Sequence, residues 1–129
     1  MSTMIRTIQS VTMSGSNSTA AAAMAWPYDE TGVLQSARIL VQKAVAADDS
    51  NYITISATQN STAIFAARAT TSGGGALLVG DTLAMTLGTT MIGEKLELKK
   101  GEEVTFAVAE NGTGPAFELS IELVYKLVN

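Results

Sequence analysis

Apolar and polar residues alternate along most of this chain. The pattern is clearest over residues 117–127, where apolar residues occupy every second position and Glu118, Ser120, Glu122 and Lys126 lie between them. A two-residue period is typical of a β-strand with one face in the core and one in water. Residues 52–57 and 103–110 repeat the pattern. Their expected inner faces carry Ile53, Ile55, Val104, Phe106 and Val108.

Weaker alternation predicts further strands at residues 4–13, 20–25, 33–44, 62–70, 82–87 and 95–98. In the segment 33–44 we expect Val33, Ala37, Ile39 and Val41 to face inward. In the segment 62–70 one face carries Ala63, Phe65, Ala67 and Ala69, and the other carries Ile64, Ala66, Arg68 and Thr70. The run of alanines in 20–25 has intrinsic helix propensity. Its context, with Pro27 just beyond and strands on both sides, favours a strand.

Turn-forming residues separate these segments at short intervals. The connection Asn111-Gly112-Thr113-Gly114-Pro115 is strong turn chemistry, and it predicts that 103–110 and 117–127 pair as a hairpin. About eight short antiparallel strands with such turns are typical of a jelly roll. We therefore predict an all-β protein, a jelly-roll-like β-sandwich with an N-terminal strand or arm.

A chain of 129 residues is long enough for one domain with its own core. The polar link Ser14–Thr19 divides an N-terminal portion, residues 1–19, from a single sandwich domain at 20–129. Two alternatives remain for the strand within the first portion. It is either the first strand of the sandwich or an arm that pairs with the edge of a neighbouring subunit.

Composition narrows the possible partners. Hydrophobic residues make up 47% of the chain and charged residues only 16%, so little charge opposes association, and we expect a homo-oligomer or docking onto another protein. The net charge of -4 and the scattered basic residues argue against a nucleic-acid partner. The N-terminus alternates polar with apolar residues and lacks the continuous apolar region of a signal peptide, and the longest apolar run, 20–26, is too short to span a membrane. The absence of cysteine fits synthesis in a reducing cytoplasm.

The chain contains no histidine and no cysteine, which removes the commonest general base, metal ligand and thiol nucleophile. Carboxylate pairs remain as candidates for glycoside hydrolysis. They are Glu102 with Glu103, Asp48 with Asp49, and Glu118 with Glu122. The first two pairs fall in turns and the third on the wet face of a strand, where solvated acids are ordinary. We expect no catalytic residues, no enzyme activity and no cofactor.

Two other groups have both a functional and a structural interpretation. Asp48, Asp49 and Asn51 offer oxygen ligands, but calcium needs six to eight, so a loop that caps its own backbone is the favoured interpretation. Trp26 and Tyr28 flank Pro27 and could form an aromatic platform for a sugar. The favoured alternative is a tryptophan packed at the end of the core, with its ring N–H bonded to a partner.

From Ala37 to Leu127 the order of features resembles small jelly-roll proteins of tailed-bacteriophage virions, of the head decoration, cement or head-fibre type. The resemblance rests on four segments in order, none of them specific alone. They are a strand entry at Asp49–Tyr52, a loop at Ala67–Gly74, a hairpin at Leu96–Val104 and a turn at Gly112–Gly114. The N-terminal part of the chain matches nothing in this family.

The resemblance implies a virion structural protein that binds the outside of a capsid, with the major capsid protein as its partner and a homotrimer as its assembly. It implies a location on the capsid exterior after synthesis in the host cytoplasm. The N-terminal segment is then expected to make capsid or intersubunit contacts, and its removal is expected to leave a folded domain. The residues expected in these contacts are Met4, Ile5, Ile8, Val11 and Met13. The alternative function is a carbohydrate- or receptor-binding module of a phage fibre or tail, with Trp26 and Tyr28 as contact residues.

Overall fold

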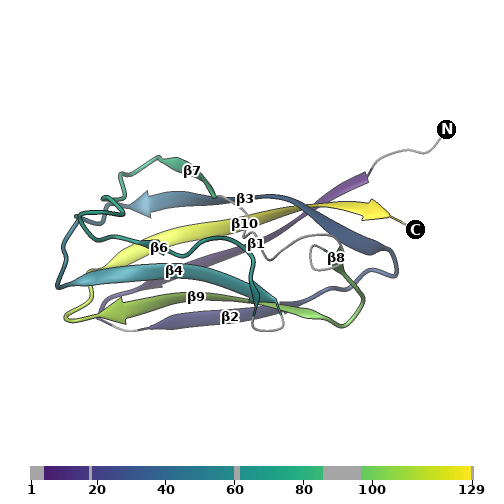
Figure 1. Cartoon of the computed structure of the whole chain (residues 1–129), viewed down its shortest axis with the longest axis horizontal. Coiled ribbons are helices and arrows are strands. Elements are labelled where there is room, and N and C mark those ends of the chain that lie inside the picture. Colours follow the sequence, from purple (N-terminus) through teal and green to yellow (C-terminus); the bar gives the residue numbers. More distant parts are fainter. Residues whose placement is uncertain (1–4, 18, 60–61, 86–96, 129) are drawn as a thin grey trace.

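The computed structural model describes residues 5–17, 19–59, 62–85 and 97–128 of the chain. In these residues the chain forms two antiparallel β-sheets packed face to face (Figure 1). Sheet A contains β1 (Ile5–Gly15), β3 (Thr31–Lys43), β7 (Thr82–Met85), β8 (Glu97–Leu98) and β10 (Phe117–Val128). Sheet B contains β2 (Ala20–Ala25), β4 (Tyr52–Gln59), β5 (Thr62–Ala63), β6 (Arg68–Ala69) and β9 (Glu103–Asn111). The predicted β-sandwich is confirmed.

The strand order is that of a jelly roll. Sheet A runs β1-β10-β3-β7, with β8 also beside β3, and sheet B runs β2-β9-β4-β5, with β6 also beside β4. The last long strands, β10 and β9, thus each return to lie between an early pair, β1 and β3 or β2 and β4. This return is the Greek-key connection, and a jelly roll contains two of them.

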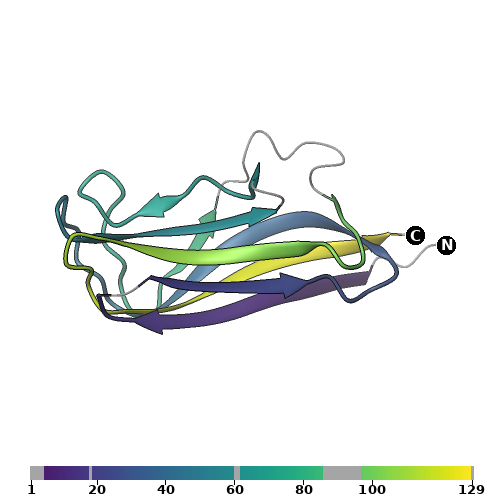
Figure 2. The ribbon, with the colours of Figure 1, turned by 90° about the horizontal axis from the view of Figure 1, so that it is seen from below.

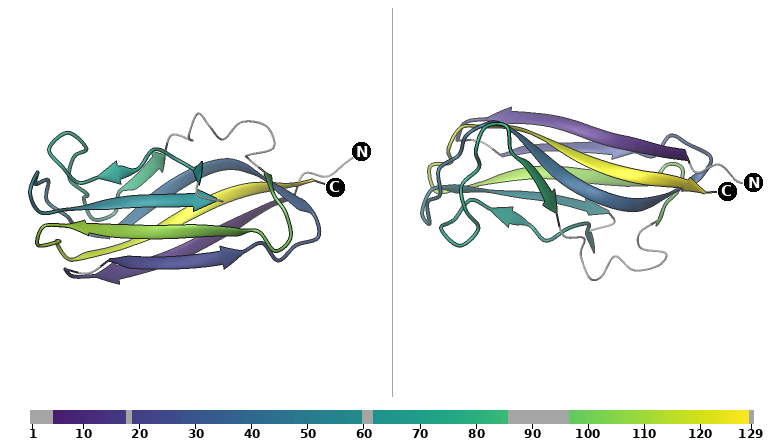
Figure 3. Two further views of the ribbon diagram at one scale, coloured as in Figure 1. Left: turned by 60° about the horizontal axis from the view of Figure 1, so that its bottom comes forward. Right: turned by 90° about the horizontal axis from the view of Figure 1, so that it is seen from above.

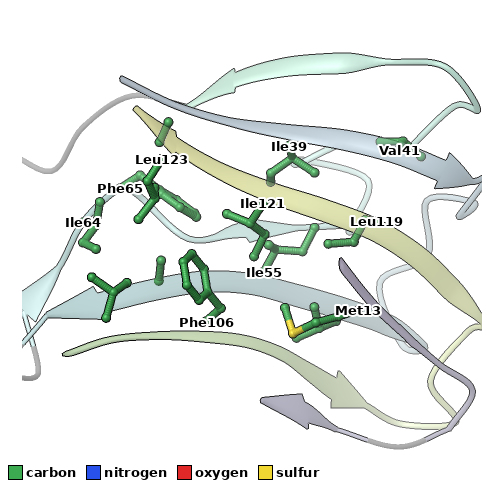
Figure 4. Packing of buried hydrophobic residues seen from close by; sticks show 14 of the residues in the cluster. Met13, Ile39, Val41, Ile55, Ile64, Phe65, Phe106, Leu119, Ile121 and Leu123 are labelled. Carbon is green, nitrogen blue, oxygen red and sulfur yellow. The ribbon is translucent and has the colours of Figure 1, made fainter. Parts of the chain in front are cut away.

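The inward faces of both sheets meet in one apolar core (Figure 4). The alternation in the last strand is confirmed, because Phe117, Leu119, Ile121, Leu123 and Tyr125 are all at most 1% exposed. Ile53, Ile55, Val104, Phe106 and Val108 are fully buried from the opposite sheet, as their period predicted. Burial of this apolar surface is the main term that stabilises the sandwich.

The predicted hairpin between 103–110 and 117–127 is wrong. β9 pairs with β2 and β4, whereas β10 pairs with β1 and β3, so the turn at 112–116 crosses from one sheet to the other. The turn residues signal only that the chain reverses direction. They do not signal whether the next strand joins the same sheet or the facing one.

Two expected inner faces also differ. Val33 is only partly buried and Leu34 lies in the core instead, because a register shift at Val124/Tyr125 makes Gln35 and Ser36 both exposed and reverses the alternation. The segment 62–70 is not one strand. Ile64 and Phe65 are both buried, and two successive side chains can point into the core only if the chain leaves the regular pleat between β5 and β6.

The N-terminal strand belongs to this chain's own sandwich in the structure. β1 pairs with β10 from Ile5↔Leu127 to Gly15↔Phe117 without a register shift. Ser14 and Gly15, which the sequence placed in the polar link, are still part of the strand. Beyond it Asn17 exchanges hydrogen bonds with Gly114, through its backbone N–H at 3.1 Å and its side-chain oxygen at 3.3 Å.

The strands connect at two ends of the sandwich (Figure 3). One end, which we call the loop end, gathers four connections: residues 16–19, 44–51, 70–81 and 112–116. The other, the terminal end, holds the start of β1, the end of β10 and the connections 26–30 and 99–102. The candidate residues from the sequence divide between these two ends, β1 and β10.

Candidate binding surfaces

In the acidic loop Asp48–Asn51, at the loop end, the Asp48 side chain bonds to the backbone of its own loop. Asp48 Oδ1 accepts hydrogen bonds from the N–H groups of Ser50 at 2.7 Å and Asn51 at 2.8 Å. These bonds, with that from Asn51 the larger cause, hold the pKa of the Asp48 carboxyl below its usual value, because they favour the charged form. The oxygens of Asp48 thus serve as turn caps.

Asp49 and Asn51 tie neighbouring loops together. Asp49 accepts hydrogen bonds from the backbone N–H and the hydroxyl of Ser72, all at 2.8 Å, and these bonds lower the pKa of its carboxyl. Asn51 Oδ1 accepts the N–H of Thr113 at 2.8 Å. The side chains of Asp49 and Asn51 therefore join the loop at 48–51 to those at 71–75 and 112–114, while Asp48 caps its own turn. Among the described residues, no group of three or more acidic side chains is placed to hold a metal ion.

The other candidate carboxylates have similar structural partners or face solvent. Glu102 Oε1 accepts the N–H of Lys99 at 2.6 Å and closes the turn before β9, while Glu103 is exposed. On the outer face of sheet A, Glu122 accepts two hydrogen bonds from Arg38, at 3.0 and 3.2 Å. The hydrogen bond and the attraction to Glu122 raise the pKa of Arg38. Glu118 is exposed on the same face.

Trp26 and Tyr28 lie at the terminal end, but only one of them is accessible. Trp26 is 1% exposed, and its Nε1–H donates to the carbonyl of Glu30 at 2.8 Å. Its ring packs against Tyr125 at a centroid distance of 4.8 Å and meets Tyr28 edge-on at 5.1 Å. The structural interpretation of Trp26 is therefore confirmed. Tyr28, 41% exposed, is the only ring of the pair that can reach a ligand.

The contact residues expected in β1 do not share one surface. Ile8 points outward from sheet A and is 53% exposed, whereas Met13 lies in the core and is 6% exposed. Val11 is partly buried and packs against the core. Ile5 begins the strand, and Met4 lies outside the described residues. Strand alternation separates these residues, so only Ile8 of those whose side chains are described is fully available for contact.

The structure adds a surface that the sequence analysis missed, a turn at Leu78–Asp81. Leu78 and Val79 are 61% and 67% exposed, the highest values among the large hydrophobic residues described. The signal was present in the sequence, because two bulky apolar residues directly precede the turn pair Gly80-Asp81 and therefore fall in a connection.

Hydrogen bonds on both sides hold this turn against β3. Val41 donates its N–H to the carbonyl of Asp81 and accepts the N–H of Gly80, both at 2.9 Å. Within the turn, Asp81 donates its N–H to the carbonyl of Leu78, and Gly80 adopts a φ of 88° that favours glycine. The two apolar side chains are thus presented to solvent by a fixed backbone.

Comparisons of the chain with models of known protein families, with curated protein sequences and with solved structures each give no match. No helix long and apolar enough to cross a membrane occurs in the part of the chain that the structure describes.

Proposed function

We propose that this chain is a virion structural protein that binds the outside of a bacteriophage capsid and reinforces it. The observation that carries the proposal is the Leu78–Asp81 turn, which holds two large apolar side chains in water on a fixed backbone. Apolar anchors of this kind supply much of the binding energy in protein–protein contacts when a partner pocket covers them.

The chemistry around the turn favours a protein partner. Asp81 is part of the turn, and Asp48 and Asp49 lie in a neighbouring connection at the same end of the sandwich, so the local charge opposes binding to an anionic lipid surface or to nucleic acid. The resemblance of residues 37–127 to head decoration proteins implies that this partner is the major capsid protein. Each bound copy would favour the assembled shell by its own binding free energy.

The sandwich suits a structural role of this kind. Its stability comes from a core built by both sheets. Hydrogen bonds accepted by the side-chain oxygens of Asp49, Asn51 and Asn17 connect the loops at the end that carries the turn. A rigid loop end presents the anchors without a large entropic cost on binding. The trimer implied by the resemblance is part of the same proposal.

The proposal is tested with purified expanded capsids that lack the chain. Leu78→Ser and Val79→Ser should each weaken binding about tenfold or more, without changing the thermal unfolding temperature, since both side chains are exposed. Ala76→Ser, an exposed position in the same loop, is the matched control and should bind as the unchanged protein does. Undiminished binding of both serine variants would refute the role of the turn, and failure of the unchanged chain to bind capsids would refute the function.

A glycan-binding module of a fibre or tail is the second candidate, and it depends on the exposed ring of Tyr28. It predicts binding on a glycan array that is lost in Tyr28→Ala. Because Trp26 is buried, that platform has one ring only, which is the reason we place this function second.

A further inference from the structure

Among the described strands, β1 is the outermost of sheet A and has a neighbour on one side only. It pairs with β10 along its whole length, and none of the other described strands pairs with its second side. Figures 2 and 3 show β1 (purple) running along the margin of the sandwich, next to the shorter β2. A free strand edge presents unpaired backbone N–H and C=O groups that can pair with another chain.

The other described sheet edges are shorter or interrupted. β5, β6 and β8 have two residues each, β7 has four and β2 has six, whereas β1 has eleven. Natural edges are usually protected by short strands, prolines, bulges or charges. β1 has neither a proline nor a register shift, and Arg6 is its only ionisable side chain. It is therefore the edge best suited to pairing.

The hydrogen-bond phase of sheet A identifies which residues of β1 face the free side. The backbone N–H and C=O of Val41 bond to Asp81 and Gly80 on the β7 side of β3. Successive residues of a strand direct these groups to opposite sides, so the backbone groups of Arg38 and Leu40 point toward β10. The backbone groups of their partners Glu122 and Ser120 therefore point toward β3. Those of the intervening residues Leu119, Ile121 and Leu123 point toward β1. In β1, the residues of even number therefore direct their backbone groups to the free side. They are Arg6, Ile8, Ser10, Thr12 and Ser14.

We propose that a second copy of this chain pairs with β1 through an antiparallel two-fold contact centred on Ser10. In this register Ser10 faces Ser10 of the other copy, Ile8 faces Thr12, and Arg6 faces Ser14. Each pair exchanges two backbone hydrogen bonds, so every outward-directed N–H and C=O of the strand is satisfied. Sheet A then continues from one copy into the other.

Side chains on the outer face match this register. Ser14 lies beside Glu118 of its own chain, so Arg6 of one copy comes within side-chain reach of Glu118 of the other, and the two-fold axis repeats this opposite-charge pair. Within one chain Arg6 and Glu118 lie at opposite ends of the sheet, next to Lys126 and Ser14. Ile8, 53% exposed, is placed beside Thr12 and loses part of its contact with water.

The contact is long but narrow. Eleven residues of strand extend about 36 Å, yet one strand pair buries less surface than the roughly 1,200–2,000 Å² typical of stable complexes. We therefore expect a dimer that forms at high micromolar concentration and dissociates on dilution. The contact needs no capsid, so it stands or falls independently of the proposed function. Within a trimeric assembly, it would join copies from neighbouring trimers.

Cysteine cross-linking tests the register, because the chain has no cysteine of its own. Paired residues that exchange hydrogen bonds lie about 5.5 Å apart between Cα atoms, within disulfide reach. Ser10→Cys should therefore form a covalent dimer under mild oxidation. Ile8→Cys alone should not, since the two copies of Ile8 are about 13 Å apart along the strand. The double variant Ile8→Cys/Thr12→Cys should cross-link again, and Ala23→Cys on exposed β2 is the control for random collision.

Charge exchange tests the same contact without a covalent bond. Sedimentation velocity over a concentration series should show dimers, and Arg6→Glu or Glu118→Arg should each raise the dissociation constant about three- to tenfold. The double variant Arg6→Glu/Glu118→Arg should restore association to within about threefold, because the exchanged charges again face each other. All these residues are exposed in one copy, so the monomer should stay folded.

A monomer at every concentration overturns the proposal. So does a dimer or trimer in which Ser10→Cys cross-links no faster than Ala23→Cys, since the contact would then lie elsewhere. Cross-linking at Ser10 together with recovery in the charge-exchanged double variant supports it.

Discussion

The indole ring of Trp26 lies directly over the α-carbon of Gly32. A β-carbon at Gly32 would come 2.5 Å from both Cζ2 and Cη2 of the ring. Gly32 sits in β3 between Leu127 of β10 and Leu98 of β8, so the backbone there has strands on both sides and cannot move away. Glycine is required at this position by lack of space, and the close approach seals the terminal end of the core.

This relationship predicts that Gly32→Ala is destabilising. The added methyl group must displace a ring that is fully buried, and such overpacking costs about 1–3 kcal/mol. The free energy of unfolding from urea titration measures it. Gly73→Ala provides the control, since nothing lies within 4 Å of a β-carbon there. Equal stability of Gly32→Ala and the unchanged protein would mean that Trp26 does not hold this position.

Ile64→Ala and Phe65→Ala should both be strongly destabilising, by about 2–5 and 3–5 kcal/mol respectively. In a regular strand, one of two neighbouring residues faces water, and its truncation costs little. Here both are at most 1% exposed, so each substitution leaves a cavity. Ala67→Ser at a nearby exposed position should change stability by less than about 0.5 kcal/mol. If only one of the two alanine variants is destabilised, the inference that both side chains point into the core between β5 and β6 is wrong.

Tyr125→Phe should keep the stability at neutral pH or raise it by up to about 1 kcal/mol. The hydroxyl is buried and has no hydrogen-bond partner among the described residues, while the ring contact with Trp26 remains in the variant. Burial also raises the pKa of the Tyr125 hydroxyl, because it disfavours the ionised form. Above about pH 10 the tyrosine ionises more readily in the unfolded chain than in the folded one, so the protein loses stability as the pH rises further. Urea midpoints between pH 7 and 11 should therefore fall more for the unchanged protein than for Tyr125→Phe.

The hydrogen bonds to Asp49 predict how stability changes at acid pH. Hydrogen bonds from Ser72 lower the pKa of its carboxyl, so the ionised form stabilises the fold above about pH 4, and this contribution is lost as the pH falls through the lowered value. Asp49→Asn should be less stable at pH 7 and should lose less further stability between pH 5 and 2. Asp29→Asn, at an exposed carboxyl that pairs with Lys100, is the matched substitution. Identical acid profiles for Asp49→Asn and the unchanged protein would contradict the prediction.

The two-residue period by itself determined the class of fold and most of the core. It placed Ile53, Phe106 and Ile121 correctly because a strand that borders a core must alternate, whatever its neighbours are. The lack of space beside Gly32, by contrast, left no trace in the pattern, since it arises from a ring six residues earlier in the chain.

Only the tertiary structure decided which strands pair and which apolar residues remain in water. The turn at Asn111–Pro115 predicts a hairpin, but β10 pairs with β1 and β3 in the sheet opposite β9. The many long-range hydrogen bonds of these two ladders outweigh the preference of one local turn. The two-residue period places Ile8 and Met13 on opposite faces of β1, but only the packing of the two sheets decided which face is the core. Only the turn at Leu78–Asp81 decided that Leu77 is buried while Leu78 is exposed. Residues of similar hydrophobicity differ in exposure here because strand register and a single turn direct one into the core and the other to the surface.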